Sequence, residues 1–250
     1  MPGGKPTFAF LLLKEHPYGR EMLRQLLSEG FVPSLVITED SDIATEEREK
    51  FLIRIAGNDI APEVLTQLAE VETKTGTAVK HVTVEKHVSS QVMPYLEELG
   101  ERLDLVVLGG TRIIRGKILE FPKYAVLNSH PGLLPDCRGS ASPAWSVYHD
   151  IKVGSSTHFC DPGIDTGNLL LRREVPVRRG MTYEDLCYHT LVLAGVLMKE
   201  ALMAYEADTI DGMRTVQGES AHPTFKNAGP EILEVVHQKL RDCTYAHYVA

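Results

Sequence analysis

Cysteine is scarce in this sequence, and its placement excludes several classes of protein. No C-x-x-C pair occurs, and the spacing between cysteines is wide, so we expect neither a zinc site nor a small disulfide scaffold. Reduced thiols in a cytoplasmic protein are the simplest interpretation. The cysteines are Cys137, Cys160, Cys187 and Cys243.

Long apolar runs and an excess of basic charge are also missing. The N-terminal apolar run Phe8 to Leu13 is closed by Lys14 and Glu15 well before membrane-spanning length, so we expect a buried strand and no signal peptide. The chain has 26 Lys and Arg against 34 Asp and Glu, a net charge of -8 and a pI near 5.7. This excess of acids gives no sign of a basic surface that would bind a phosphate backbone, so neither nucleic acid nor a membrane is an expected partner.

What is present is typical of a globular α/β protein of one or two domains. The chain has 250 residues, 43% of them hydrophobic and 24% charged, and shows no internal repeat or low-complexity tract. Residues 7–13 form an apolar run of strand length, residues 18–29 have helical spacing, and residues 32–38 form a second apolar run. This βαβ order predicts a doubly wound, mostly parallel sheet with helices on both faces.

The alternation continues along the chain and predicts two regions. Two inserted helices are expected between 41 and 75, the first starting at Thr45 and the second with Pro62 in its first turn. Residues 1–205 are predicted to form the main domain, and 206–250 a C-terminal extension too short for its own core. The other expected strands are 78–84, 105–108, 125–127, 155–160 and 167–177, and the other expected helices are 87–99, 115–121, 141–150, 182–205 and 231–241.

Polar residues follow the strand that starts at Ala125. Asn128 and His130 are two residues apart, so their side chains project to the same side if the strand continues through them. Open α/β sheets bind ligands at the carboxyl ends of their strands. Alone, this stretch is also compatible with a turn capped by polar residues. It is followed by Leu133-Leu134-Pro135, Arg138-Gly139, Ser156-Thr157-His158-Phe159 and Gly163-Ile164-Asp165-Thr166-Gly167.

At these segments the chain resembles the folate-dependent formyltransferase family. The resemblance covers residues 7–205 in outline and is specific over about 104–177. It implies a Rossmann-like formyltransferase fold and a catalytic trio of Asn128, His130 and Asp165. It also implies N10-formyltetrahydrofolate as the formyl donor and a cytoplasmic enzyme of one-carbon metabolism.

The chemistry of formyl transfer suits these residue types. A neutral amine that attacks a formyl carbon generates an oxyanion, which a side-chain amide such as Asn128 and an imidazolium such as His130 can stabilise. A carboxylate such as Asp165 can raise the pKa of the histidine, fix its ring and relay the proton shed by the amine. The remaining histidines show no second-ligand spacing, so no metal is expected.

The resemblance also implies residues around the trio. By the match, two facing loops bind the folate: Thr111, Arg112, Ile113 and Ile114, and Cys160, Asp161, Gly163 and Ile164. Arg138, Gly139 and His158 are expected to support the substrate or the trio. Alternatives stay open for three side chains, because Arg112 could be a solvated surface cation, Arg138 could pair with an acid, and His158 could be structural.

Departures from the family's patterns reduce the range of acceptor substrates that we expect. The stretch Leu11 to Arg20 contains a single Gly, so the phosphate loop of the purine-biosynthesis members is absent, and Ala194 stands near the position of their ribose-binding Glu. Residues 207–250 contain six acids against four Lys and Arg, unlike the basic tRNA-binding domain of the methionyl-tRNA members. The sequence starts directly at the first strand, which disfavours formyltetrahydrofolate hydrolase.

A small-molecule amine acceptor remains, such as a sugar-nucleotide, amino-acid-derived or natural-product amine. The alternatives are the hydrolase and a non-catalytic folate-binding regulator on the same scaffold, which the insertion at 41–75 and the tail motivate. The tail segment with Gln217 and His222 to Lys226 resembles a family segment that crosses back near the acceptor pocket, although a surface linker is an equal interpretation of such common residues. The apolar helix 231–240 could cover the core or a partner subunit, so the oligomeric state is not predicted.

Overall fold

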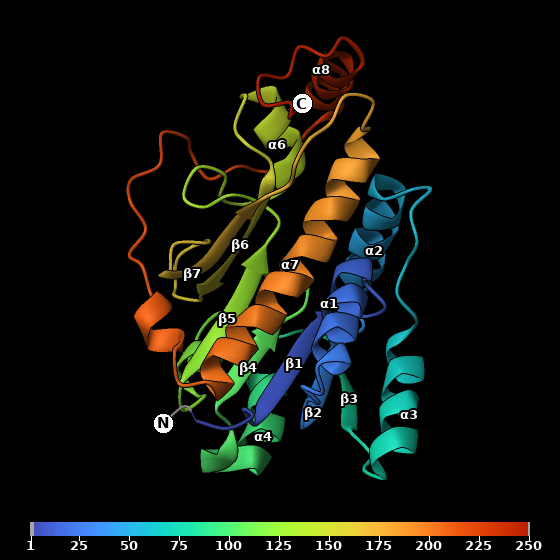
Figure 1. Ribbon diagram of the computed structural model, residues 1–250. Helices are drawn as coiled ribbons and strands as arrows, with labels where there is room; N and C mark the ends of the chain where they lie inside the picture. Colours follow the sequence, from blue (N-terminus) through green and yellow to red (C-terminus); the bar gives the residue numbers. More distant parts are fainter. Residues whose placement is uncertain (1–2, 250) are drawn as a thin grey trace.

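The computed structural model describes residues 3–249 and contains one seven-stranded sheet (Figure 1). The strand order is β3-β2-β1-β4-β5-β6-β7; β1 to β5 run parallel, whereas β6 and β7 pair antiparallel. This confirms the predicted mostly parallel α/β sheet. The strands are β1 Phe8–Leu13, β2 Leu35–Glu39, β3 Lys80–Val84, β4 Leu105–Leu108, β5 Ala125–His130, β6 Gly154–Phe159 and β7 Leu169–Glu174.

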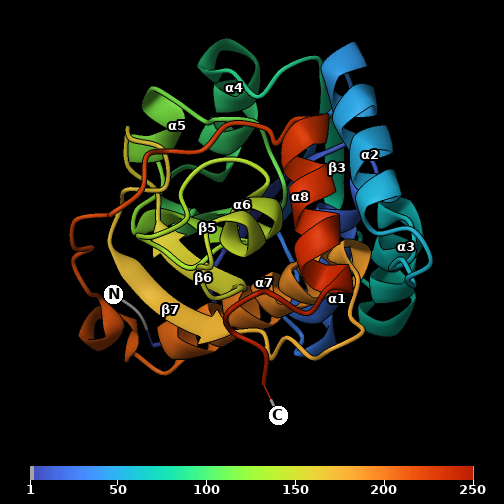
Figure 2. The same ribbon diagram turned by 90° about the horizontal axis from the view of Figure 1, so that it is seen from above.

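Helices cover both faces of the sheet, as Figure 2 shows from above. α1 and α7 lie on one face and α4 and α5 on the other, while α6 and α8 stand over the carboxyl ends of the central strands (Figures 1 and 2). The helices are α1 Pro17–Ser28, α2 Asp42–Arg54, α3 Val64–Thr75, α4 Ser89–Leu99, α5 Lys117–Glu120, α6 Ser142–Tyr148, α7 Tyr183–Glu206 and α8 Pro230–Arg241, with short 3₁₀ turns at Gly100–Arg102 and Ile210–Met213.

The central strand β1 shows why two layers of helices are needed. Successive side chains of a strand point to opposite faces. Phe8, Phe10 and Leu12 pack in the core shared with α1 and α7, whereas Ala9 and Leu11 pack in the core shared with α4. Each fully buried side chain of this size contributes roughly 1.5–3 kcal/mol. A strand that is apolar on both faces is therefore stable only between two layers.

The long helix α7 begins as the sequence predicts. Thr182 accepts from the Asp185 N–H, and the Asp185 carboxylate accepts from the Thr182 N–H, which forms a capping box. By length and composition α7 could cross a membrane, with a mean hydropathy of 1.4 over 18 residues, but 56% of that window is buried inside the protein. Its apolar character is that of a core helix.

Most predicted boundaries differ from the structure by a few residues, and two of these differences have a clear local cause. The second strand starts at Leu35 instead of residue 32, because Pro33 has no N–H to donate to the β1 ladder. The first inserted helix starts at Asp42 instead of Thr45, because Ser41 caps it by accepting from the Ala44 N–H at 3.1 Å. Both helices predicted between 41 and 75 are present as α2 and α3.

A buried histidine begins α1, next to the carboxyl end of β1. His16 Nδ1 accepts from the Tyr18 N–H at 3.2 Å, and its ring packs against Phe51 of α2 at 4.7 Å between centroids. Burial, together with the nearby Arg54 and Arg48, lowers the pKa of His16 from 6.5 to about 3. The cap is therefore a neutral ring at physiological pH.

Replacement of His16 tests this cap. The unfolded chain protonates His16 near pH 6.5 and the folded chain only near 3, so the stability that the neutral ring confers above pH 6.5 is lost as the pH falls toward 3. His16→Asn keeps an acceptor for Tyr18 but removes this titration. We expect the acid-induced fall in unfolding free energy to shrink by on the order of 2–4 kcal/mol in urea titrations from about pH 7 to about pH 4.

The comparison needs no further control for the other histidines, since they titrate equally in both proteins. Parallel stability curves for the wild type and His16→Asn would contradict the prediction.

Candidate active site

The antiparallel pairing of β5 with β6 gathers polar side chains at one end of the sheet. β5 continues through His130, beyond its predicted end at residue 127, so Asn128 and His130 lie on one strand, and Asn128 lies opposite His158 in the register. Asn128 Nδ2 lies 3.3 Å from His158 Nε2, and Asp165 reaches both histidines at 3.5 Å. The structure thus brings together the three predicted catalytic residues, with His158 between Asn128 and Asp165.

Asp165 is a nearly buried carboxylate in a constrained backbone. Its φ is 54°, a left-handed conformation that Asp tolerates better than most residues. Its Oδ2 accepts from the Gly139 N–H at 2.9 Å. Burial alone would raise the pKa of Asp165, but His130, His158 and the Gly139 N–H outweigh it and hold the pKa well below its usual range.

The His130 ring is fixed by groups that the sequence did not single out. Its Nε2 lies 2.7 Å from the Cys137 carbonyl and 2.9 Å from Ser142 Oγ. A carbonyl can only accept, so Nε2 carries a proton and donates to Cys137. Asp165 faces the other nitrogen, Nδ1, at 3.5 Å, which is ion-pair distance. Cys137 and Ser142 therefore orient the ring from its Nε2 side, while Asp165 lies beside Nδ1.

A tyrosine from the start of the chain supports the same strand end. The Tyr18 hydroxyl donates to the Ser129 carbonyl, between Asn128 and His130. Tyr18 is buried, and burial together with Asp165 raises its pKa well above its usual value. It stays a hydroxyl donor and ties α1 to the carboxyl end of β5.

The predicted folate loop at 160–164 is folded around Asp161. Asp161 Oδ1 accepts from the Gly163 N–H at 3.0 Å and from the Thr166 hydroxyl at 2.6 Å. At Gly167 a Cβ would lie 1.9 Å from the Phe159 carbonyl, so no other residue fits there. The Asp161 carboxylate thus shapes the loop. Ile164 is exposed at its tip.

The other predicted folate loop, 111–114, follows β4. Its four residues lie in different environments. Thr111 is half-buried, Arg112 and Ile113 are exposed, and Ile114 is buried in the core beside α4. Arg112 Nη1 lies 3.7 Å from the buried carboxylate of Glu39, so this guanidinium faces an acid at the end of β2.

The two supporting residues at 138 and 139 lie under the C-terminal tail. Arg138 donates to Gln217 Oε1 from Nη2 at 2.9 Å and from Nε at 3.3 Å. The Arg138 carbonyl accepts from the Phe225 N–H, and the Phe225 carbonyl accepts from the Ser140 N–H. The tail therefore crosses back over the site, while most of its side chains between 214 and 228 stay exposed.

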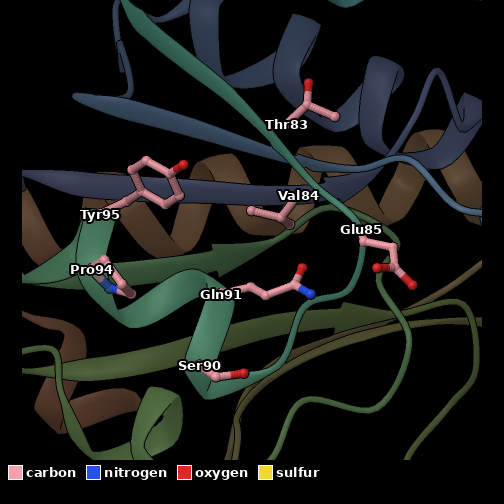
Figure 3. A pocket seen from close by; sticks show the side chains of 7 residues that line it. All are labelled: Thr83, Val84, Glu85, Ser90, Gln91, Pro94 and Tyr95. Atoms are coloured by element: carbon pink, nitrogen blue, oxygen red, sulfur yellow. The ribbon is translucent and has the colours of Figure 1, made fainter.

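A separate hollow of about 390 Å³ lies at the carboxyl end of the edge strand β3 and the start of α4 (Figure 3). Its lining includes Glu85, Gln91 and Tyr95 and none of the predicted site residues. Within residues 3–249, no group of three or more His, Cys, Asp and Glu side chains is arranged to hold a metal ion.

Comparison with known proteins matches this chain to one family. A family model described as "Formyl transferase" matches residues 9–202. The methionyl-tRNA formyltransferase of Clostridium acetobutylicum is 33% identical over 123 residues, which cover 49% of this chain and 39% of that protein. That of Acidobacterium capsulatum is 36% identical over 107 residues, 42% of this chain and 34% of that protein. The chain thus matches well under half the length of these relatives.

Solved structures match over more of the chain at lower identity, and they support the fold. Glycinamide ribonucleotide transformylase 1 from Symbiobacterium toebii has a TM-score of 0.58 at 24% identity and covers 86% of this chain and 96% of its own. An N-formyltransferase from Helicobacter canadensis, in complex with folinic acid and dTDP-3-aminofucose, has a TM-score of 0.60 at 18% identity and covers 89% of this chain and 71% of its own.

Two glycines with similar backbone angles test the contact between tail and site. Gly139 has φ +95° and Gly180 φ +91°, but a Cβ would lie 2.1 Å from the Phe225 carbonyl at Gly139 and would meet nothing at Gly180. We expect Gly180→Ala to cost about 1 kcal/mol for the backbone alone. Gly139→Ala should cost roughly 1–3 kcal/mol more, because the tail must move. Urea denaturation measures both, and equal costs would contradict a tight contact.

Proposed function

The chain belongs to the formyl transferase family, and from this premise we propose that it transfers a formyl group from N10-formyltetrahydrofolate to the amine of a small acceptor. The observation that carries the proposal is the cluster of Asn128, His130, His158 and a buried, ionised Asp165 at the carboxyl end of β5. Amide, imidazole and carboxylate groups are the donors and bases that formyl transfer between nitrogens requires.

Each residue of the trio has a distinct proposed role. Asn128 donates an amide N–H to the formyl oxygen as negative charge develops there. His130 adds positive charge from its Nδ1 side, since Nε2 is committed to Cys137. Asp165 lies beside that nitrogen and accepts the proton that the attacking amine sheds. The proton finally replaces the formyl group on the folate nitrogen, so the transfer balances.

The two predicted folate loops have the character that a flat heterocycle needs. The folate supplies the activated formyl group when bound. Ile113 on one loop and Ile164 on the other are large apolar side chains with 55% and 38% of their surface exposed. Exposed apolar side chains beside backbone donors and acceptors are a common lining for such ligands. We propose that these side chains contact the folate, whereas Ile114 and Asp161 hold the loops in shape.

Two arginines favour an acceptor that carries negative charge. Arg48 and Arg54 of α2 are half-buried, and among the described residues neither has an ion pair or a side-chain hydrogen bond. Both lie near His16 at the start of α1, and Arg54 also lies near Tyr183 and Cys187. The Glu15 carboxylate lies near Arg48 but outside ion-pair distance, and a partly desolvated cation without a close partner is costly. We propose that an anionic group of the acceptor pairs with them.

Three other functions are kept as candidates. Formylation of methionyl-tRNA is favoured by the named activity of the relatives matched over 123 and 107 residues, although residues 207–250 carry more acids than bases. Hydrolysis of the formyl-folate would use the same trio with water as the acceptor. A regulator that binds folate without turnover is the non-catalytic alternative.

Measurement of folate release with and without an amine panel tests the proposal. The panel should include an amino sugar on a nucleoside diphosphate, glycinamide ribonucleotide, methionyl-tRNA and free amino acids. We expect turnover only with an amine; turnover in water alone would instead identify a hydrolase. His130→Ala and Asp165→Asn should lower the rate about 10²- to 10⁴-fold, and Asn128→Ala about 10²- to 10³-fold.

His189→Ala is the matched control, because His189 is an exposed histidine of α7. A folded His130→Ala protein that formylates its amine at the wild-type rate would refute the catalytic role.

The arginine pair is tested by substrate-specific kinetics. Arg54→Gln and Arg48→Gln should each raise KM for an anionic acceptor by about tenfold, since a charge-assisted bond contributes about 1.5–3 kcal/mol. The KM for formyl-folate should not change. A rise in the folate KM instead would assign the arginines to the folate carboxylates. Arg102→Gln is the control, because Arg102 is exposed at the amino end of β4.

A further inference from the structure

One side chain of the tail joins the 138–139 loop to the 161–167 loop of the candidate active site. Gln217 Nε2 donates to the Asp165 carbonyl at 2.8 Å and to the Gly167 carbonyl at 2.6 Å. Its Oε1 accepts from Arg138 at 2.9 and 3.3 Å. These contacts span 79 residues to Arg138 and 52 to Asp165.

The amide orientation follows from its neighbours. Carbonyls can only accept and a guanidinium can only donate, so the nitrogen of Gln217 must face Asp165 and Gly167 and its oxygen must face Arg138. No other uncharged side chain of this length supplies both donor and acceptor. Gln217 is half-buried, so water competes only partly for these bonds.

The same loops also meet directly through the catalytic carboxylate. The Gly139 N–H donates to Asp165 Oδ2 at 2.9 Å, while Gln217 bonds the main chain of Asp165 and the side chain of Arg138. Asp165 is held at a positive φ of 54°, a conformation that persists only where its surroundings hold it. Gln217 and Gly139 are the groups that bond Asp165 from the tail and from the 138–139 loop.

We infer that Gln217 is a positioning residue, which holds the Asp165 carboxylate against His130 by tying the 161–167 loop to Arg138. This inference rests on the proposed function and extends it, because it makes the tail a working part of the catalytic centre.

Neighbouring contacts of the tail keep Gln217 in place. Thr215 pairs with Leu169 through two backbone hydrogen bonds of 2.8 and 2.9 Å, and the Arg214 guanidinium lies 4.0 Å from the centre of the Phe159 ring. On the other side, Phe225 pairs with the backbone around Gly139 and stacks on Trp145 at 4.8 Å. Gln217 therefore lies between two anchored points, so its replacement removes its own bonds without freeing the whole tail.

The test uses the full chain with three variants. Gln217→Leu removes every bond of the amide. Gln217→Glu keeps the acceptor for Arg138 but places an acceptor against the carbonyls of Asp165 and Gly167, and its bond to Arg138 keeps the tail attached should the Leu variant not fold. Gln238→Leu is the matched control, because Gln238 is an exposed glutamine of α8 that bonds neighbours near its own helix end.

Two readouts separate positioning from a general loss of stability. For both Gln217 variants, we expect kcat for amine formylation to fall at least tenfold while KM for formyl-folate changes less than threefold. The Gly139 amide, whose hydrogen bond ends on the Asp165 carboxylate, should exchange its hydrogen at least tenfold faster in amide-resolved NMR exchange. Gln238→Leu should match the wild type in both.

The exchange readout does not depend on turnover. If Gly139 exchanges at the wild-type rate in a folded Gln217 variant, the inference is overturned whatever the activity. An unchanged kcat would overturn it equally. A wild-type protein without any formyl transfer would refute the proposed function, and the Gly139 exchange would still decide whether Gln217 holds Asp165.

Discussion

An ionised carboxylate stays inside a protein only where donors and positive charge surround it. Asp165 meets this condition through His130 on β5, His158 on β6 and the N–H of Gly139. These groups come from three segments, so the sheet must change from parallel to antiparallel at β5 to bring His158 beside Asn128. The segments that meet at this end of the sheet therefore surround one carboxylate with positive charge and an N–H donor.

The sheet and its order of elements could be predicted because their signals are local. Apolar runs of strand length and helical spacing recur within each segment, and the capping box at Thr182 is readable within four residues. The positions of Asn128, His130 and Asp165 came from ordered motifs that lie within forty residues of one another in the sequence. Their proximity in space agrees with that order.

The resemblance placed the tail segment with Gln217 near the site as one alternative, but the partners of the supporting side chains could not be predicted, for a physical reason. Tyr18, Ser142 and Gln217 act mainly on backbone carbonyls or on a ring nitrogen. Every residue has a backbone carbonyl, so a hydrogen bond to a carbonyl does not require a particular amino acid at the accepting position. The sequence therefore carries no motif for the two residues that form such a bond. The ring of His130 is an example, because the carboxylate beside Nδ1 is predicted from the sequence whereas the contacts of Cys137 and Ser142 with Nε2 are not.

The position of the tail contacts in the sequence also determines when they can form during synthesis of the chain. Chains emerge from the ribosome N-terminus first and fold as they appear. All seven strands and Tyr18 are complete by Glu174, but Gln217 and Phe225 follow some fifty residues later in the chain. All seven strands and the covering helix α7 precede both residues, so the sheet and its helical layers can form while the loops at 138–139 and 161–167 still lack their contacts with the tail. The candidate active site therefore gains its contacts with Gln217 and Phe225 only after the sheet and α7 have been synthesised, and before α8.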